Sequence, residues 1–203
     1  NVVQYSSPVQ IPGTTWSQAL LNTQSNAAAI KTDGTLWAWG LNQFGTLGQN
    51  ISMSPGARSS PVQIPGTTWS GYTNGGNSVT CYGVKTDGTL WSWGYSGAGS
   101  LGHNQAYPAG SYSSPTQIPG TTWTNNMNAG YTIFGGVKTD GTLWTIGANT
   151  VGALGQNNTT SRSSPVQIPG TTWSKIASSG TGLAAIKTDG TMWSWGQNNH
   201  GQV

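Results

Sequence analysis

The sequence is built around four copies of one motif, in which Lys-Thr-Asp-Gly-Thr precedes Leu or Met and then Trp. The copies occupy residues 31–40, 85–94, 138–147 and 187–196. Ser-Ser-Pro and Ile-Pro-Gly-Thr-Thr-Trp recur at the same interval of about 50 residues, which is typical of repeat architectures. The chain is therefore expected to form one repeat domain, residues 1–203, within a longer tandem array. Its four units fall at approximately residues 1–50, 51–104, 105–157 and 158–203.

The Asp-Gly pair at the centre of each motif predicts a β-hairpin, because a two-residue type I′ turn needs positive φ at both central residues. With Asp33 and Gly34 as the turn, Ile30 would lie opposite Trp37, and small residues such as Ala29 would lie on the other face. One sheet could then stack its bulky face on the small face of the next. The structural residues of these hairpins are Asp33, Gly34, Trp37, Asp87, Gly88, Trp91, Asp140, Gly141, Trp144, Asp189, Gly190 and Trp193.

Each unit contains enough strand-forming sequence for four short strands. In the first unit these fall at residues 7–11, 16–21, 27–32 and 35–39, with Pro8 at the start of the first, where a missing N–H is tolerated. Four-stranded units that cannot bury both faces alone are typical of β-propeller blades. The predicted fold is therefore all-β, a β-propeller or an arc of one built from four blades. A β-solenoid is the alternative, although its rungs are usually shorter and lack hairpins.

The composition agrees with a turn-rich β scaffold and narrows the range of partners. The 203 residues include 31 glycines and 11 tryptophans, and only 5% are charged, far below the usual fraction. Four of the seven cations lie two residues from an aspartate, and the others, Arg58, Arg162 and Lys175, are scattered, so nucleic acid is not an expected partner. Cys81 is the only cysteine, so an intrachain disulfide cannot form. No apolar run is long enough to predict a membrane span.

A second motif follows each hairpin and carries a family resemblance. Trp-Gly-x-Asn-x-x-Gly-x-Leu-Gly runs from Trp39 to Gly48 and is partly retained in the other three units. Together with Ser-Ser-Pro-Val and the apolar strand before the Asp-Gly turn, it resembles the repeats of the regulator of chromosome condensation family. The resemblance covers the whole chain and implies a β-propeller, usually with seven blades. Four units would then form a smaller ring, or one completed by further copies or by the rest of a longer chain.

The family also implies two functions, nucleotide exchange on a small GTPase and chromatin binding. Exchange activity would predict a β-wing insertion or a basic tail, and the sequence contains neither. Three departures from the family pattern weaken the transfer of a specific function. Ile146 replaces the second Trp of the third unit, Ser96 stands where the second unit should have Asn, and no unit has the family's His before the hairpin.

The sequence offers no group of residues arranged for catalysis. The four aspartates are the only acidic residues, and each lies in a turn, where Asp is favoured for its conformation. His103 and His200 lie in different units without a second ligand at metal-binding spacing, so no metal or cofactor is expected. The tryptophans fall at repeat positions and are expected between blades. The chain is therefore expected not to be an enzyme. A lyase acting in a propeller funnel would need convergent His, Glu or Arg, and Glu is absent.

Function is expected in the segments that vary between units, because repeat proteins keep their scaffold and change their loops. The connecting loops at residues 41–58, 95–112 and 148–162 vary, as do segments 71–78 and 125–132. The second connecting loop is the most aromatic, and Tyr beside Gly, Ser and Asn suits adaptable recognition. The candidate partner-binding residues are Arg58, Tyr95, His103, Tyr107, Tyr112 and Arg162.

The expected function is that of a binding or structural module whose partner is a protein or a surface glycan. A glycan-binding, lectin-like propeller would need exposed aromatic residues, and this alternative stays open. The neutral, lysine-poor surface rich in Asn, Ser and Thr favours a setting outside the cell, on a cell surface or on a virus particle. A cytoplasmic location is the alternative.

Overall fold

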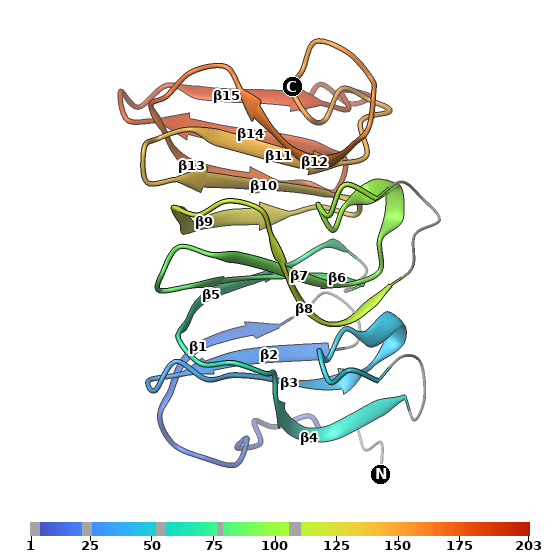
Figure 1. Cartoon of the computed structure of the whole chain (residues 1–203), viewed down its shortest axis with the longest axis vertical. Coiled ribbons are helices and arrows are strands. Elements are labelled where there is room, and N and C mark those ends of the chain that lie inside the picture. Colours follow the sequence, from blue (N-terminus) through green and yellow to red (C-terminus); the bar gives the residue numbers. More distant parts are fainter. Residues whose placement is uncertain (1–4, 22–25, 52–55, 77–78, 106–110) are drawn as a thin grey trace.

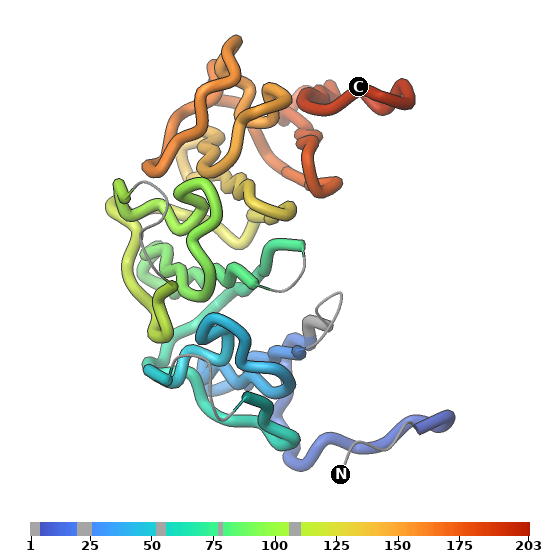
Figure 2. Tube along the Cα trace, turned by 90° about the vertical axis from the view of Figure 1, so that its right-hand side faces the viewer, coloured from blue at the N-terminus to red at the C-terminus, as the bar shows by residue number. Residues whose placement is uncertain are grey.

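The computed structural model describes residues 5–21, 26–51, 56–76, 79–105 and 111–203. Within these ranges the chain forms antiparallel strands, loops and short 3₁₀ turns such as η1 (Gln43–Gly45) and η3 (Gly97–Gly99). The sheets stack side by side along the longest axis of the molecule (Figure 1). Seen from the side, the stack curves into an arc (Figure 2). The predicted all-β, blade-like architecture is confirmed.

Three of the four sheets have four strands, and neighbouring strands in each sheet are consecutive in the chain. The first contains β1 (Trp16–Leu21), β2 (Asn26–Lys31), β3 (Leu36–Leu41) and β4 (Ala57–Gln63). The second contains β5 (Trp69–Asn74), β6 (Thr80–Lys85), β7 (Leu90–Gly94) and β8 (Tyr112–Ile118). The third contains β9 (Trp123–Ala129), β10 (Ile133–Lys138), β11 (Leu143–Gly147) and β12 (Arg162–Ile168). The fourth contains β13 (Trp173–Ser178), β14 (Gly182–Lys187) and β15 (Met192–Gly196).

Each four-stranded sheet takes its strands from two consecutive sequence units. Its outer strand carries Ser-Ser-Pro and pairs with the third strand of the sheet, which is the last strand of the preceding unit. The register is the same in all three sheets, with the pairs Ala38–Val62, Ser92–Thr116 and Thr145–Val166. The predicted first strand at residues 7–11 is wrong, since this segment has no strand pairing. Among the described residues, no third strand of another sheet lies beside it.

The Asp-Gly hairpins close with three-residue loops, and the predicted two-residue turns are wrong. Lys31 N donates to Thr35 O at 2.9 Å, and Gly34 N donates to Lys31 O at 3.0 Å. Thr32 and Asp33 therefore form the centre of a type I turn, and Gly34 follows with a φ of 78°. This is a type I turn followed by a G1 bulge, in which the glycine alone needs positive φ.

The extra loop residue shifts the register by one, so the strand before each hairpin is turned over relative to the strand after it and different residues share each face. Trp37 lies opposite Ala29, and the predicted pairing with Ile30 is wrong. The equivalent tryptophans of the other sheets also face small residues, in the pairs Gly83–Trp91, Gly136–Trp144 and Ala185–Trp193. Each sheet thus has a tryptophan face, which carries Trp37 or its equivalent. The other side is an aliphatic face, which carries Ile30 and Leu36 or their equivalents.

The small partner makes room for a third tryptophan, from the first strand of the sheet. A Cβ atom added to Gly83 would lie 2.7 Å from Cζ3 of Trp69. The ring of Trp69 packs against Trp91 and Trp93 with centroid separations of 6.3 and 6.0 Å. These tilted and edge-on contacts are the arrangement that aromatic rings prefer.

The aliphatic face of one sheet packs against the tryptophan face of the next, and these contacts form the core. In the first interface Leu36 and Ile64 meet Trp69 and Trp93 in one cluster. Leu36, Ile64 and Trp93 are completely buried there. The predicted stacking of unlike faces is correct in principle, but the partner of the tryptophan face is aliphatic rather than merely small.

Backbone hydrogen bonds join neighbouring blades at both ends of the strands. At the hairpin end, the third residue of the first three hairpin loops accepts from the next unit. The bonds are Trp69 N to Gly34 O, Trp123 N to Gly88 O and Trp173 N to Gly141 O. At the other end, Asn50 N donates to Ser113 O and Asn104 N to Ser163 O, each at 2.7 Å. The blades are thus held in a defined orientation.

Buried carbonyl groups of the connecting loops find donors across the blade interface. Thr46 O accepts from Nε1 of Trp93 at 2.9 Å, and Ala153 O accepts from Nε1 of Trp195 at 2.8 Å. Both tryptophans are the second Trp of their hairpin motif. This position therefore fills the core and also satisfies a main-chain acceptor.

In the third sheet Ile146 stands at this position and has no N–H to donate. The corresponding carbonyl, Ser100 O, accepts instead from the hydroxyl of Tyr82 at 2.7 Å. Tyr82 comes from the neighbouring sheet, and its ring lies 4.4 Å from that of Phe134 between centroids. The departure at Ile146 is thus compensated by a tyrosine on the opposing aliphatic face.

We expect Tyr82→Phe to lower the free energy of unfolding by about 1–3 kcal/mol, because the ring packing is kept while Ser100 O loses its buried donor. The urea midpoint should fall at unchanged m-value. Tyr131→Phe, which removes the hydroxyl of a ring that is 50% exposed, is the matched control and should change stability by less than about 0.5 kcal/mol. Equal midpoints for the two variants would contradict this role of Tyr82.

The four hairpin aspartates predict the response of the fold to acid. Asp33 Oδ1 accepts from the hydroxyl and the N–H of Thr35 at 2.7 and 2.9 Å, and Thr35 Oγ1 accepts from Nε1 of Trp37 at 2.8 Å. The same network occurs in the other three hairpins. Hydrogen bonds from the threonines lower the pKa of all four carboxyl groups below 3.8. The stability that a depressed pKa contributes is present above the unfolded-state value and is lost as pH falls through the folded-state value.

We expect the Tm to fall as pH is lowered from about 5 to about 2, because these are the only acidic side chains of the chain. The quadruple variant D33N, D87N, D140N and D189N keeps the carbonyl acceptors but has no carboxyl to titrate. Its Tm should depend much less on pH over the same interval, as measured by calorimetry. Parallel Tm curves for the two proteins would show that the aspartates do not set the acid response.

Candidate functional site

The variable loops gather along one edge of the arc, which we call the loop edge. The connecting loops after β3, β7 and β11 lie on the right-hand side of Figure 1, opposite the Asp-Gly hairpins. Thr80, the first residue of β6, lies beside the second connecting loop, since its Oγ1 donates to Tyr95 O at 2.9 Å. The turns at residues 130–132 and 179–181 occupy the same edge of their blades. The loop edge therefore combines connecting loops with the turns that follow the first strands.

Tyr95 links two connecting loops. Its ring lies 4.8 Å from that of Phe44 between centroids, and it is half-buried. A Cβ atom added to Gly97 would lie 2.9 Å from Cε1 of Tyr95, so the ring also covers the start of η3. These contacts give Tyr95 a role in holding the first loop against the second.

His103 and Tyr112 are the two predicted residues that the structure brings into direct contact. Their ring centroids are 5.1 Å apart. Nε2 of His103 lies 3.0 Å from Oγ of Ser92, and that hydroxyl donates to Leu101 O at 2.7 Å. Because a serine hydroxyl has one proton, Nε2 of His103 is the donor in its contact with Ser92. The hydroxyl of Tyr112 donates to Oε1 of Gln105 at 2.8 Å.

Glutamine stands at the position of His103 in the first and third connecting loops. Nε2 of Gln49 donates to Leu47 O at 3.0 Å and to Gln63 O at 2.7 Å, and Gln156 makes the equivalent bonds. Partial burial lowers the pKa of His103 below its ordinary value of 6.5. His103 therefore takes over the bracing role of a glutamine and adds a titratable group to the second loop.

The two predicted arginines occupy one repeat position with Tyr112. Arg58 is the second residue of β4 and Arg162 the first of β12. All three residues lie opposite a glycine of the third strand of their sheet. Both arginines are half-buried, and Nε of Arg162 is buried without a hydrogen-bond partner among the described residues. Within the described part of the chain, no hydrogen bond or ring contact joins either arginine to His103 or Tyr112. Tyr107 lies outside the described residues.

An exposed aromatic residue on the loop edge was missed by the sequence analysis. Tyr131, in the turn between β9 and β10, is 50% exposed. Its ring lies between two glycines of the adjoining blades, since Cβ atoms added to Gly76 and Gly180 would approach it to 2.7 and 2.8 Å. Its N–H donates to Gly180 O at 3.1 Å. The variable segment 125–132 was recognised, but only the packing of three turns shows that this residue is held open to solvent.

The opposite edge carries four lysines, each above two tryptophan rings. Nζ of Lys31 lies 4.8 Å from the ring centroid of Trp16 and 4.3 Å from that of Trp37. The other three units repeat the arrangement at 4.2–5.0 Å. Trp37 and Trp91 are half-buried. The ammonium group lies over one face of each ring, so that face is not free for a sugar to stack on.

Among the described residues, no group of three or more His, Cys, Asp or Glu side chains could hold a metal ion. Cys81 is buried, its Sγ accepts from the hydroxyl of Tyr72 at 3.2 Å, and burial raises the pKa of its thiol to about 12. The thiol is therefore uncharged at neutral pH, when it is a poor nucleophile. No helix in the described part of the chain is long and apolar enough to cross a membrane.

Two family models match the sequence. The regulator of chromosome condensation (RCC1) repeat model matches residues 33–80 and 140–186, and a second model of the same repeat matches residues 173–202. The chain belongs to the RCC1 repeat family. This assignment agrees with the resemblance found in the motif after each hairpin.

Several solved structures superimpose on nearly the whole chain. Human WBSCR16 is 20% identical with a TM-score of 0.78, and the alignment covers 95% of this chain and 50% of that protein. Yeast RCC1 (Prp20), solved bound to Kap60, is 17% identical with a TM-score of 0.80 and coverages of 95% and 46%. A second structure, of Prp20p from Saccharomyces cerevisiae, is 18% identical with a TM-score of 0.78, and the alignment covers 94% of this chain and 48% of that protein. The chain spans about half the length of these proteins, and the likeness shows the RCC1 propeller fold.

We expect the stability of the RCC1-type arc to fall as pH is lowered from about 7 to about 5, and His103→Gln to reduce this fall. A histidine whose folded-state pKa is depressed stabilises the fold above its unfolded-state pKa of about 6.5, and this contribution is lost as pH falls below that value. Urea midpoints at several pH values measure the effect. His200→Gln removes the other histidine, which is exposed, and serves as the control. A pH slope in His103→Gln as steep as in the control would contradict the role given to His103.

Proposed function

We propose that this chain is a non-enzymatic protein-binding module that contacts its partner with the loop edge. The observation that carries the proposal is the placement of Tyr131. Tyr131 is 50% exposed, and its ring is held between glycines of two adjoining blades. A tyrosine that is already ordered before binding loses little conformational freedom, and tyrosine is among the residues that dominate interface energies.

Other exposed apolar residues on the same edge support this choice of surface. Leu41, at the start of the first connecting loop, and Ile51, within it, are 38% and 37% exposed, and Val151 in the third loop is 41% exposed. Together with Tyr131 they give apolar contacts among Asn, Gln and Ser side chains. In this proposal Tyr95, His103 and Tyr112 support the loops, and Tyr131 and its apolar neighbours make the contact.

The structural neighbours support a protein partner as a class. Yeast RCC1 was solved bound to Kap60, and Prp20p was described together with its binding properties to Gsp1p and histones. At 17–18% identity these likenesses show the fold alone, so the partner of this chain is not inferred from them. The uniform hairpins and the variable loops agree with a scaffold whose specificity lies in the loops. The neutral, lysine-poor composition supports a setting outside the cell, on a cell surface or on a virus particle.

A second candidate function is nucleotide exchange on a small GTPase or chromatin binding, the two functions that the family implies. The shared fold over 94–95% of this chain supports it. The rate at which a small GTPase releases labelled GDP distinguishes an exchange factor from a simple binding module. Acceleration of that release by this chain would favour the exchange function over a simple binding module.

A photo-reactive amino acid at position 131 tests the loop-edge proposal, either in cells that produce the chain or in particles that carry it. We expect a discrete cross-linked protein from position 131 and none from position 121, an exposed threonine at the hairpin end of the same blade. Cross-links from position 121 alone, or from neither position, would overturn the proposal.

Once the cross-linked protein is purified, Tyr131→Ala should weaken its binding by about 10-fold or more, since central aromatic residues dominate interface energies. Thr121→Ala is the matched control and should leave the dissociation constant within about two-fold, as near-neutral surface positions do. Circular dichroism of both variants would show that the fold is kept. Unchanged binding by Tyr131→Ala would remove Tyr131 from the contact.

A further inference from the structure

The fourth sheet exposes an edge and a face that are covered in the other three sheets. β15 has no outer strand beside it among the described residues. Met192 is 70% exposed and Trp193 is 51% exposed. The residues at the position of Met192 in the other sheets, Leu36, Leu90 and Leu143, are completely buried. The exposure of Met192 therefore reflects a missing neighbour rather than a different local structure.

The segment that would fit beside β15 is present in the chain without a strand partner. Residues 5–11 read Tyr-Ser-Ser-Pro-Val-Gln-Ile and differ from residues 58–64 and 162–168 only at the first position. In this segment Tyr5, Val9 and Ile11 are 69%, 56% and 39% exposed. The equivalents of Ile11 in the outer strands of the other sheets are buried, namely Ile64, Ile118 and Ile168.

The donor segment and β15 lie at opposite ends of the arc. Figure 1 places β15 at one end of the stack and the N-terminal part of the chain at the other, with two further sheets between the first and the fourth. Figure 2 shows the same separation from the side. In this arrangement residues 5–11 do not reach β15 of the same molecule, so these two segments can pair only between two molecules.

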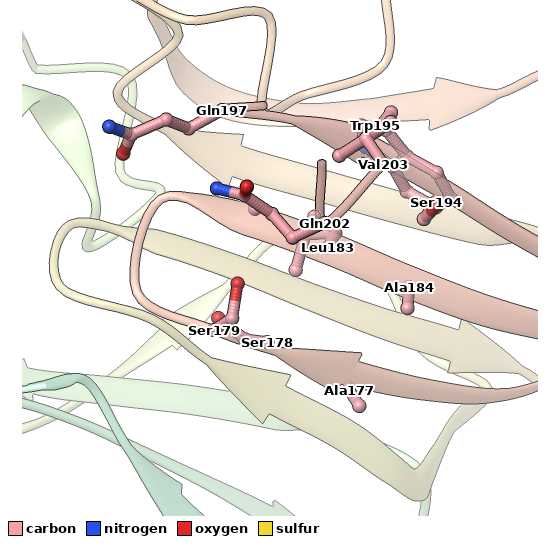
Figure 3. A pocket seen from close by; sticks show the side chains of 11 residues that line it. Ala177, Ser178, Ser179, Leu183, Ala184, Ser194, Trp195, Gln197, Gln202 and Val203 are labelled. Atoms are coloured by element: carbon pink, nitrogen blue, oxygen red, sulfur yellow. The ribbon is translucent and has the colours of Figure 1, made fainter. Parts of the chain in front are cut away.

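The uncovered faces at the two ends are also complementary. The aliphatic face of the fourth sheet has two neighbouring hollows of about 200 and 210 Å³. The first is lined by Ala184, Ser194 and Gln202 (Figure 3), and the second by Ile186 and Met192. At the other end of the arc, the tryptophan face of the first sheet carries Trp16, Trp37 and Trp39. Aliphatic and tryptophan faces pack against each other at every interface within the chain.

We propose that this end of the arc is the docking site for the first blade of a second copy of this chain, whose residues 5–11 add to β15 as the missing fourth strand. The internal sheets give the register directly. The pair Ala38–Val62 corresponds to Ser194 opposite Val9 of the second copy, and Trp37–Gln63 corresponds to Trp193 opposite Gln10. Main-chain hydrogen bonds then provide affinity, as in other cases of strand addition.

The same correspondence assigns a hydrogen bond to the hollow of Figure 3. Within the chain, Nε1 of Trp93 donates to Thr46 O across the first interface. The repeat places Trp39 of the second copy at the position of Trp93, and Gln202 at the position of Thr46. Gln202 lines the hollow (Figure 3). The ring of Trp39 would fill this space and donate to Gln202 O, so strand and face dock together.

Such a contact is heterologous, because different surfaces of the two copies meet, so it closes into a ring or continues as a chain. This inference does not depend on the loop edge or on any partner bound there. Native mass spectrometry and light scattering at about 100 µM should give the mass of two or more 21.1 kDa chains. A monomer at that concentration would overturn the proposal.

Engineered cysteines test the register. A chain with Val9→Cys is mixed with a chain with Ser194→Cys and oxidised, and most of the protein should form disulfide-linked dimers, because directly opposed residues have Cβ atoms close enough for a disulfide. The native Cys81 is buried and left in place. Gln10→Cys mixed with Ser194→Cys is the matched control. Its thiols point to opposite faces of the sheet, so its yield should be at least 10-fold lower. Equal yields from the two mixtures, or no dimers from the first, would overturn the proposal.

A charge variant separates this proposal from that for the loop edge. Val9→Asp with Ile11→Asp changes two exposed residues, and we expect it to give a folded monomer with unchanged circular dichroism. Tyr131→Ala should remain oligomeric, because that residue lies on another surface. Oligomers that persist in the double-aspartate variant would show that the copies meet elsewhere and would overturn strand addition, whatever the loop edge binds.

Discussion

The architecture depends on the close approach of a tryptophan ring to a residue with little or no side chain. In the second sheet Trp69 lies over Gly83, where even one methyl group would come within 2.7 Å. This approach lets three tryptophans share one face of a narrow sheet. The apolar surface of that face is buried only when the aliphatic face of the adjoining sheet packs on it. A single blade therefore cannot bury its own tryptophan face. The tryptophans and small residues of each hairpin therefore require that the blades stack on one another.

The repeats predicted the all-β, blade-like fold, but not the register of the hairpin. Asp-Gly is compatible with a two-residue loop and with a type I turn followed by a G1 bulge, and the two differ by one residue. The observed loop makes hydrogen bonds outside the hairpin, since Thr32 N donates to Thr15 O and Gly34 O accepts from Trp69 N. These partners belong to other strands and the adjoining blade, so a local motif does not contain them. A one-residue error was enough to change which residues share each face.

The candidate site was predicted at the level of segments rather than of residues. Variation between units correctly identified the connecting loops as the part that differs from blade to blade. Aromatic composition then pointed to Tyr95 and Tyr112, whose rings contact Phe44 and His103. Tyr131 escaped notice because its exposure follows from glycines of the adjoining blades, far away in the sequence. In a protein built of stacked blades, the exposure of a side chain depends on the residues of the adjoining blades. Sequence variation within one segment does not show this.

The outer strand of each complete sheet belongs to the sequence unit that follows it, so the period of the sequence and the period of the fold are out of step. This stagger has a consequence for how such proteins lengthen during evolution. A duplication of one period, about 50 residues, inserts one complete blade wherever in the unit it begins. The insertion separates one third strand from its original outer strand, and the duplicated outer strand pairs with that third strand instead. Gene duplication need not respect the boundaries of a blade, and the number of blades can change without the invention of a new interface.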